Sequence, residues 1–264
     1  MGLLIDVQDV LKIFKSAAKT VYALEQISFE VDEGDFVSLV GPSGCGKSTL
    51  LKIVSGLLPA TAGKVAVGGR PVDGPLGNVG MVFQSPVLLK WKNVIGNIML
   101  PVEFGRLDRA SHLEKAHGLI RLVGLEGFEE MYPHQLSGGM QQRVSLCRAL
   151  VTDPQILLMD EPFGALDAMT RDELDLELLK IWDGKRKTAL FVTHNIQEAV
   201  FLSDYVVVMS PRPGRVIQRL RIDLPRPRTM EMMSSGKFCE YTLQIRAMLA
   251  SSSLSPRAAV GSTT

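Results

Sequence analysis

The sequence predicts an α/β protein built on a mostly parallel β-sheet, with a small antiparallel β layer and a helical insertion between strands. Three observations indicate this fold class. Short apolar, β-branched runs recur along the chain, helical patterns separate several of them, and an alternating apolar–polar stretch precedes them. Continuous apolar runs are typical of parallel strands covered on both faces, whereas alternation is typical of a sheet with one solvated face.

The predicted elements follow in chain order. Residues 24–31 alternate and are assigned to the antiparallel layer. Core strands are predicted at 36–40, 79–83, 156–159, 189–193 and 205–209. Strand signals disappear between about 86 and 152. Within that insertion, 109–124 reads as a helix that stops at Gly124, because apolar side chains recur at helical spacing at Ala110, Leu113, Ala116 and Ile120.

The chain is expected to form one domain over residues 1–235, which includes a helical subdomain at about 86–152. After Val216 the sequence becomes rich in Pro and Arg. An amphipathic C-terminal helix is predicted at 236–250, and the Ser/Ala/Gly-rich tail at 251–264 is expected to be disordered. We find no internal repeat and no room for a second regulatory domain.

Composition excludes several classes of protein. The chain has 264 residues and is 46% hydrophobic, which is enough for a sizeable core, and 29 basic residues nearly balance 28 acidic ones. No net positive field therefore favours nucleic acid or an anionic membrane as the main partner. No apolar run is long enough to span a membrane and no secretory leader is evident, so a soluble, cytoplasmic protein is expected. Three widely spaced cysteines favour neither disulfides nor a zinc site.

The segment GPSGCGKST directly follows the predicted strand 36–40 and leads into a helical pattern. Its glycines let backbone N–H groups wrap a phosphate, the helix N-terminus adds a positive dipole, Lys47 reaches the outer phosphates, and the Ser48 hydroxyl can hold Mg²⁺. A nucleotide-binding loop is therefore predicted; its residues are Gly41, Pro42, Ser43, Gly44, Cys45, Gly46, Lys47, Ser48 and Thr49.

Two adjacent acids end the predicted strand 156–159. Neighbouring positions at a strand end allow Asp160 to face a Mg²⁺ ion while Glu161 points toward a water molecule, for which a carboxylate can act as general base. Without the phosphate loop, such a pair would more often belong to a solvated loop.

A second glycine-containing segment, QLSGGMQQR, offers only part of a phosphate site. Ser137 is a good N-cap, and Ser137, Gly138 and Gly139 present a hydroxyl and free N–H groups at a helix start. The helix is indicated by the apolar residues Met140, Val144, Cys147 and Val151. No lysine or acidic metal ligand accompanies the segment, so it reads either as half of an anion site or as a turn with no ligand.

Six ordered motifs resemble the ATP-binding subunit of ABC transporters over residues 3 to about 220. They are the phosphate loop, Gln84 after a strand, LSGGM, ILLMDEP, GALD at 164–167 and His194 in FVTHNIQEAV. The resemblance implies a P-loop NTPase fold of the ABC nucleotide-binding type. It also implies that ATP and Mg²⁺ bind and that ATP is hydrolysed.

The resemblance assigns roles to further residues. Gln84 matches a residue that contacts Mg²⁺ and the attacking water, and His194 matches one that contacts the γ-phosphate. Phe14 resembles the aromatic residue that stacks on adenine, with Tyr22 as the competitor. Asp167 matches the loop that links two sites across a head-to-tail dimer, in which the Ser137 loop of one chain completes the site of the other.

The chain is expected to be the ATPase subunit of an importer of the nitrate, sulfonate or taurine type. The segment after Gln84 is similar to one that docks a membrane permease, and Trp91 is either an anchor there or an exposed aromatic. The implied partners are a second copy, permease subunits and, indirectly, a periplasmic or lipid-anchored solute-binding protein, with no nucleic acid. The chain is then expected at the cytoplasmic face of the inner membrane.

Other possibilities stay open at this point. A pyrimidine or thiamine precursor is the alternative solute. A soluble ABC ATPase acting on DNA or ribosomes should show a coiled-coil insertion, zinc cysteines or tandem cassettes. A small-molecule kinase or a GTPase would explain the phosphate loop but would leave Ser137, Asp167 and His194 without functions.

Overall fold

The main sheet has six strands in the order β10-β9-β3-β8-β7-β6 in the computed structural model, which describes residues 2–17, 19–164, 166–185 and 187–254. The strands are β3 (Phe36–Val40), β6 (Val79–Val82), β7 (Ile156–Asp160), β8 (Thr188–Thr193), β9 (Tyr205–Met209) and β10 (Val216–Arg221). The first five pair in parallel and match the five predicted core strands. The antiparallel edge strand β10 is not predicted by the sequence pattern.

A second, four-stranded antiparallel sheet forms the predicted β layer, in the order β2-β1-β4-β5. Its strands are β1 (Leu3–Lys15), β2 (Thr20–Asp32), β4 (Ala62–Val67) and β5 (Arg70–Pro71). The alternating stretch 24–31 lies in β2, where Ile27, Phe29 and Val31 are buried while Ser28 and Glu30 are exposed. The alternation therefore reports one solvated face, as expected.

The helices lie between and after the strands. They are α1 (Lys47–Val54), α2 (Val94–Ile98), α3 (Leu100–Gly105), α4 (Arg109–Leu122), the 3-10 helix η1 (Pro133–Gln135), α5 (Gly138–Leu150), α6 (Ala168–Lys185), α7 (Ile196–Leu202), the 3-10 helix η2 (Met230–Ser234) and α8 (Gly236–Leu254). Helices α2 to α5 form the helical insertion around an apolar cluster of their own. Gly124, with φ +65°, follows α4.

The C-terminal helix is longer than the sequence pattern indicates. Helix α8 continues through Leu254, so residues 251–254 are helical rather than disordered as expected. The rest of the expected tail, 255–264, lies outside the described residues. In the described part of the chain, no helix combines the length and the apolar character that crossing a membrane requires.

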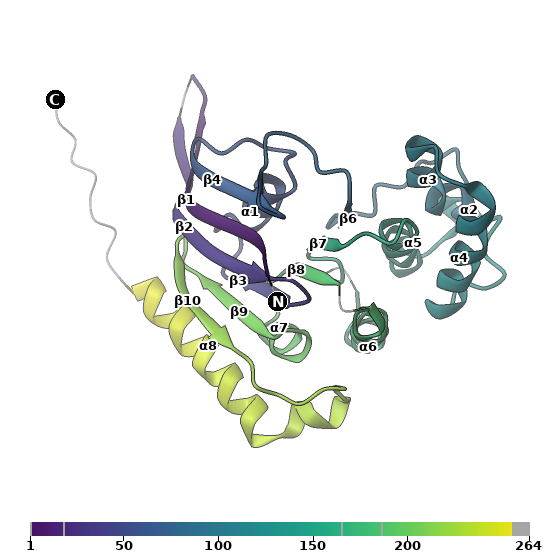
Figure 1. Ribbon diagram of the computed structural model, residues 1–264. Helices are drawn as coiled ribbons and strands as arrows, with labels where there is room; N and C mark the ends of the chain where they lie inside the picture. The colour runs from purple at the N-terminus through teal and green to yellow at the C-terminus, as the bar shows by residue number, and fades with distance from the viewer. Residues whose placement is uncertain (1, 18, 165, 186, 255–264) are drawn as a thin grey trace.

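The main sheet is buried on both faces, which explains the continuous apolar runs. Every residue of β3, β7 and β8 is buried. One face packs against α6, α7 and α8, and the other packs against α1 and the antiparallel sheet (Figure 1). Strands β3, β8 and β7 are parallel neighbours, so their carboxyl ends open at one edge of the sheet, where ligands bind in such folds. The phosphate loop, His194 and Glu161 follow these three strands.

Candidate functional site

The phosphate loop is a tight turn between β3 and α1 that only glycine permits at a key position. Gly46 precedes the helix with φ +112°, and a Cβ atom there would lie 2.6 Å from Leu24 Cδ2. This close approach fixes the loop against β2. The Arg212 guanidinium, which the sequence analysis did not single out, donates to Gly44 O from Nε at 3.0 Å and Nη2 at 2.7 Å. The outer rim of the loop is thus held from the segment after β9.

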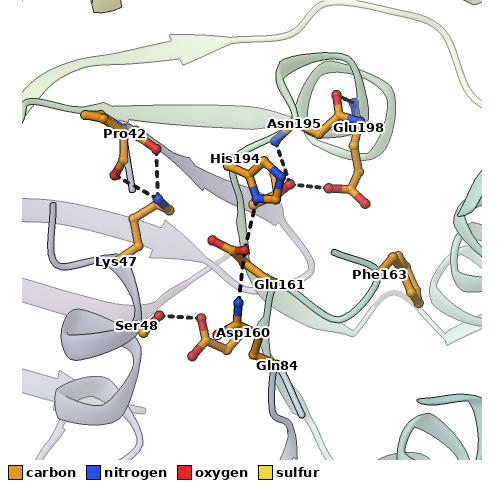
Figure 2. Close-up of polar contacts among 12 residues, drawn as sticks. Pro42, Lys47, Ser48, Gln84, Asp160, Glu161, Phe163, His194, Asn195 and Glu198 are labelled. Atoms are coloured by element: carbon orange, nitrogen blue, oxygen red, sulfur yellow. Dashed lines mark hydrogen bonds and ion pairs between the residues drawn. The ribbon is translucent and has the colours of Figure 1, made fainter. Parts of the chain in front are cut away.

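The predicted side chains of the loop converge with the end of β7. The buried Lys47 ammonium donates to Gly41 O at 2.8 Å and to Pro42 O at 3.2 Å, which holds it across the mouth of the loop. Ser48 Oγ donates to Asp160 Oδ1 at 2.7 Å (Figure 2). The hydroxyl and the carboxylate predicted as metal ligands are therefore in direct contact, although 112 residues separate them.

The donor set at Asp160 fits Mg²⁺. Desolvation is the main cause that raises the pKa of this carboxyl, and the hydrogen bond from Ser48 opposes it, so a bound cation would offset the cost of burying the charge. Among residues 2–17, 19–164, 166–185 and 187–254, no group of three or more His, Cys, Asp or Glu side chains is arranged to hold a metal ion by itself. One carboxylate and one hydroxyl, completed by water and substrate phosphates, are what Mg²⁺ usually accepts in ATPase sites, because it retains much of its hydration.

The carboxylate of Glu161 lies between two other predicted residues. His194 Nδ1 lies 3.0 Å from Glu161 Oε2, and Gln84 Nε2 donates to the same oxygen over 3.4 Å (Figure 2). Glu161 has φ +44°, a conformation that side chains other than glycine rarely adopt, and its N–H donates to Val192 O at 2.8 Å. The strained backbone turns the carboxylate away from Asp160 toward His194 and Gln84.

Behind His194 lies a set of polar residues that sequence reasoning missed. Asn195 Oδ1 accepts the N–H groups of Gln197 and Glu198 and so caps α7. The Thr193 hydroxyl hydrogen-bonds the buried Glu198 carboxyl and accepts the Asn195 N–H at 2.9 Å. An Asn directly before a helical pattern is a capping signal that could have located this turn.

Within the LSGGM segment, Ser137 and Gly138 are exposed, Gly139 and Met140 are half-buried, and Leu136 is buried. Ser137 Oγ caps α5 by accepting the Met140 N–H at 3.2 Å, and Gly138 is exposed beside it. In Figure 1, α5 lies on the other side of β6 and β7 from α1, the helix that follows the phosphate loop.

Asp167 occupies the start of α6 near the LSGGM segment. Its Oδ1 accepts the Thr170 N–H at 3.1 Å, and hydrogen bonds from the Thr170 side chain and then its backbone lower the pKa of the exposed carboxyl. The neighbouring Leu166 approaches Gly139, where a Cβ atom would lie 3.2 Å from Leu166 Cδ2. Ala165 of the GALD segment lies outside the described residues.

Sequence comparison identifies the family. A sequence model described as ABC transporter matches residues 24–164. The chain belongs to the ABC transporter family. It is 48% identical to an uncharacterized ABC transporter ATP-binding protein of Methanocaldococcus jannaschii, over 94% of this chain and 92% of that one. It is an ATPase of this family, as predicted.

Other relatives are named importer subunits. The taurine import ATP-binding protein TauB of Rhizobium johnstonii is 47% identical over 88% of this chain and 90% of its own length. The aliphatic sulfonates import ATP-binding protein SsuB of Bacillus cereus is 42% identical over 91% and 94%. Among solved structures, a dimeric post-hydrolysis state of the cassette MJ0796, bound to ADP and Pi, superimposes with a TM-score of 0.76 at 31% identity, covering 84% of this chain and all of that one.

The ABC fold separates the two candidate adenine-stacking residues onto different faces of the β1–β2 pair. Ile13 pairs with Tyr22, whereas Phe14 pairs with Val21. Lys12 pairs with Leu24, and the register shifts between Lys12 and Ile13. Phe14 lies two residues after Lys12 and so shares its face with Lys12 and Leu24, the residue that contacts the phosphate loop. Phe14 is 43% exposed there, and the Lys12 ammonium lies 5.2 Å from its ring centroid. The register favours Phe14 over Tyr22.

Trp91 stands on the helical subdomain, away from the nucleotide residues. Its side chain is 73% exposed and borders a surface hollow of about 380 Å³. The rim of the hollow includes Glu103, Arg109, Glu130 and Tyr132. An exposed aromatic beside a polar-rimmed hollow has the composition of an interface anchor.

Proposed function

We propose that this ABC ATPase drives import of a small sulfonate- or taurine-like solute through a membrane permease. The names of the relatives support this solute class over nitrate and over a pyrimidine or thiamine precursor. The permease would dock at the hollow beside Trp91, and a periplasmic or lipid-anchored protein would deliver the solute to it. The chain would work at the cytoplasmic face of the inner membrane, held there by the permease.

The active assembly in this proposal is a head-to-tail dimer of two identical chains. Ser137, Gly138 and Gly139 of one chain would donate to the γ-phosphate of ATP held by the Lys47 loop of the other. The separation of α5 from α1 within one chain and the dimeric state of the MJ0796 cassette both support this arrangement. Asp167 would lie at the contact between the chains, and Phe14 would stack on adenine.

In the proposed reaction each residue has a distinct task. Lys47 and the N–H groups of its loop would neutralise the phosphates, and Ser48, Asp160 and Gln84 would hold Mg²⁺, which supplies further charge neutralisation when bound. Glu161 would take the proton from the attacking water. His194 and Gln84, which flank its carboxylate, would keep it oriented.

One observation carries the assignment: the Glu161 carboxylate is held between His194 and Gln84, one residue after the acid that contacts Ser48. Glu161→Gln keeps the shape but removes the base, so kcat is expected to fall by about 10²-fold or more. Phosphate release by the full-length chain would measure this, and size-exclusion chromatography with ATP should show that the variant still dimerises.

The exposed Glu30, far along β2 from this site, provides the matched control. Glu30→Gln should release phosphate at the wild-type rate. Normal turnover by Glu161→Gln, or a variant that stays monomeric at saturating ATP, would overturn the proposed mechanism.

A further inference from the structure

Helix α5 holds the backbone on both sides of Gln84. The Arg148 guanidinium donates from Nη1 to Val87 O and from Nη2 to Pro86 O, each at 2.8 Å. On the other side of Gln84, Nε2 of the buried Gln142 donates to Phe83 O at 3.1 Å. Two side chains of one helix thus fix three carbonyl groups within residues 83–87.

The turn that Arg148 holds is strained. Val87 has φ +45°, which is rare for any residue other than glycine and is most costly for a β-branched one. Its side chain is 58% exposed, so little packing compensates for this conformation. Burial lowers the pKa of Arg148, which shows that placing the cation here has a cost. Charge-assisted hydrogen bonds to two carbonyls offset that cost and hold the turn.

The N-terminus of α5 and the later part of this helix belong to two different candidate sites. Its N-terminus carries the exposed Ser137, and residues 142 and 148 farther along the helix grip the segment that carries Gln84. Gln84 Nε2 in turn contacts the Glu161 carboxylate. A helix is rigid on this length scale, so a shift at Ser137 would move the backbone around Gln84 with it.

We propose that Arg148, assisted by Gln142, is a positioning residue that holds the strained turn at Val87 and thereby makes the placement of Gln84 follow α5. The inference rests on the proposed function. In the proposed dimer, the Ser137 end of α5 serves the partner's ATP, whereas Gln84 serves the chain's own ATP. Helix α5 would then link the two sites, and Arg148 would join this helix to the segment that carries Gln84.

The test compares full-length variants by steady-state ATPase kinetics. Arg148→Lys keeps the charge but loses the two-pronged geometry, so kcat is expected to fall about tenfold through misplacement of Gln84. The KM for ATP should stay within about twofold, because the ATP-binding residues are untouched. The Hill coefficient for ATP should fall toward 1 if α5 links the sites.

A second substitution separates positioning from general stability. Glycine adopts a positive φ freely, so Val87→Gly should keep the turn without the guanidinium. The double variant Arg148→Lys/Val87→Gly is expected to recover kcat to within about threefold of wild type, whereas a loss due to poor packing of α5 would not be rescued. Val87→Gly alone should turn over near the wild-type rate.

Two further variants complete the design. Arg143→Lys is the matched control, since Arg143 lies on the same helix but donates to Val123 O, away from Gln84. Its kcat should not change. If Arg148→Lys fails to fold, Gln142→Met, which removes only the bond to Phe83, should lower kcat by about threefold with KM unchanged.

The outcomes are distinguishable. A folded Arg148→Lys or Gln142→Met variant with normal kcat, or a double variant that is not rescued, overturns the positioning role. Glu161→Gln is measured in parallel. If that variant turns over normally, the proposed function fails, whereas if it is inactive while Arg148→Lys is normal, only the present inference fails.

Discussion

Single residues in this site are held in conformations that their neighbours impose. Glu161 and Val87 both have a positive φ, and each is fixed by backbone hydrogen bonds, through the Glu161 N–H and the Val87 carbonyl. Such strain is typical of functional positions, since it persists only where the surroundings hold it. In this chain the Glu161 carboxylate faces His194, and Arg148 holds the strained turn after Gln84.

Met140 offers a test at the residue scale. The Met140 N–H donates to Ser137 Oγ, and the Met140 side chain packs against the apolar cluster of the helical subdomain. The proposed phosphate donors Ser137, Gly138 and Gly139 therefore do not depend on a polar side chain at position 140. We expect Met140→Gln to change the ATPase rate by less than about threefold, within the range of a side chain that makes no specific transition-state contact. A large gain in rate would show that methionine impairs the natural half-site.

At the scale of elements, α7 is fixed at both ends and so positions His194. Asn195 caps its N-terminus, and the buried Arg228 donates to the carbonyls of Val200, Phe201 and Ser203 at its C-terminus. Arg228 lies in the Pro/Arg-rich segment, which sequence analysis left without a function. That segment therefore holds the C-terminal end of the helix that follows His194.

The buried Glu198 of α7 predicts a pH-dependent stability. Burial is the main cause that raises the pKa of Glu198 to about 7 from an ordinary value of 4.5, and the Thr193 hydrogen bond and the Arg171 charge oppose the shift. The folded state keeps this proton where the unfolded chain has lost it. The contribution of Glu198 to stability is therefore complete below pH 4.5 and is lost progressively as the pH rises toward about 7.

Glu198→Gln should remove this dependence. Between about pH 5.5 and about pH 7.5, the wild-type Tm is expected to fall by roughly 4 °C more than that of the variant. Thermal melts of both full-length chains would measure it. Glu114→Gln, on the exposed face of α4, should keep the wild-type slope, and equal slopes for wild type and Glu198→Gln would contradict the assignment.

At the scale of the whole molecule, the two candidate phosphate-binding segments lie apart within one chain. Helix α1, which follows the Lys47 loop, and helix α5, which follows Ser137, lie on opposite sides of β6 and β7, so the proposed function needs two copies to complete a site. In the proposed dimer the Lys47 loop of each chain meets the Ser137 segment of the other, which is an isologous contact, so the two-fold dimer has two equivalent sites.

Complementation would test this arrangement. Lys47→Met and Ser137→Arg should each be nearly inactive alone, because one breaks every phosphate loop and the other every half-site. In an equal mixture, about half of the dimers are mixed and each has one intact site of two, so turnover should recover to about a quarter of wild type. Phosphate release with ATP measures it. No recovery on mixing, or full activity of Ser137→Arg alone, would contradict the dimer.

The sequence by itself determined the features of this protein that are formed by residues adjacent in the chain. The five core strands, the antiparallel layer, the glycine that ends α4, the N-cap of α5 and the phosphate loop could all be predicted, because each depends on residues close together in the chain. The edge strand β10 could not, because half of its residues are exposed, the others are only half-buried, and they form no continuous apolar run. The helical state of residues 251–254 could not be predicted either, because their Ser-rich composition is not typical of a helix.

Only the tertiary structure decided which distant residues meet. The Ser48–Asp160 contact, the placement of Glu161 between Gln84 and His194, and the hold of Arg148 on the turn at Val87 join segments 33 to 112 residues apart. The resemblance to a family could suggest the first two, but nothing in the local pattern indicates the third. Such contacts depend on strand order and helix packing, and these are set by burial over the whole chain rather than by the propensity of any one segment.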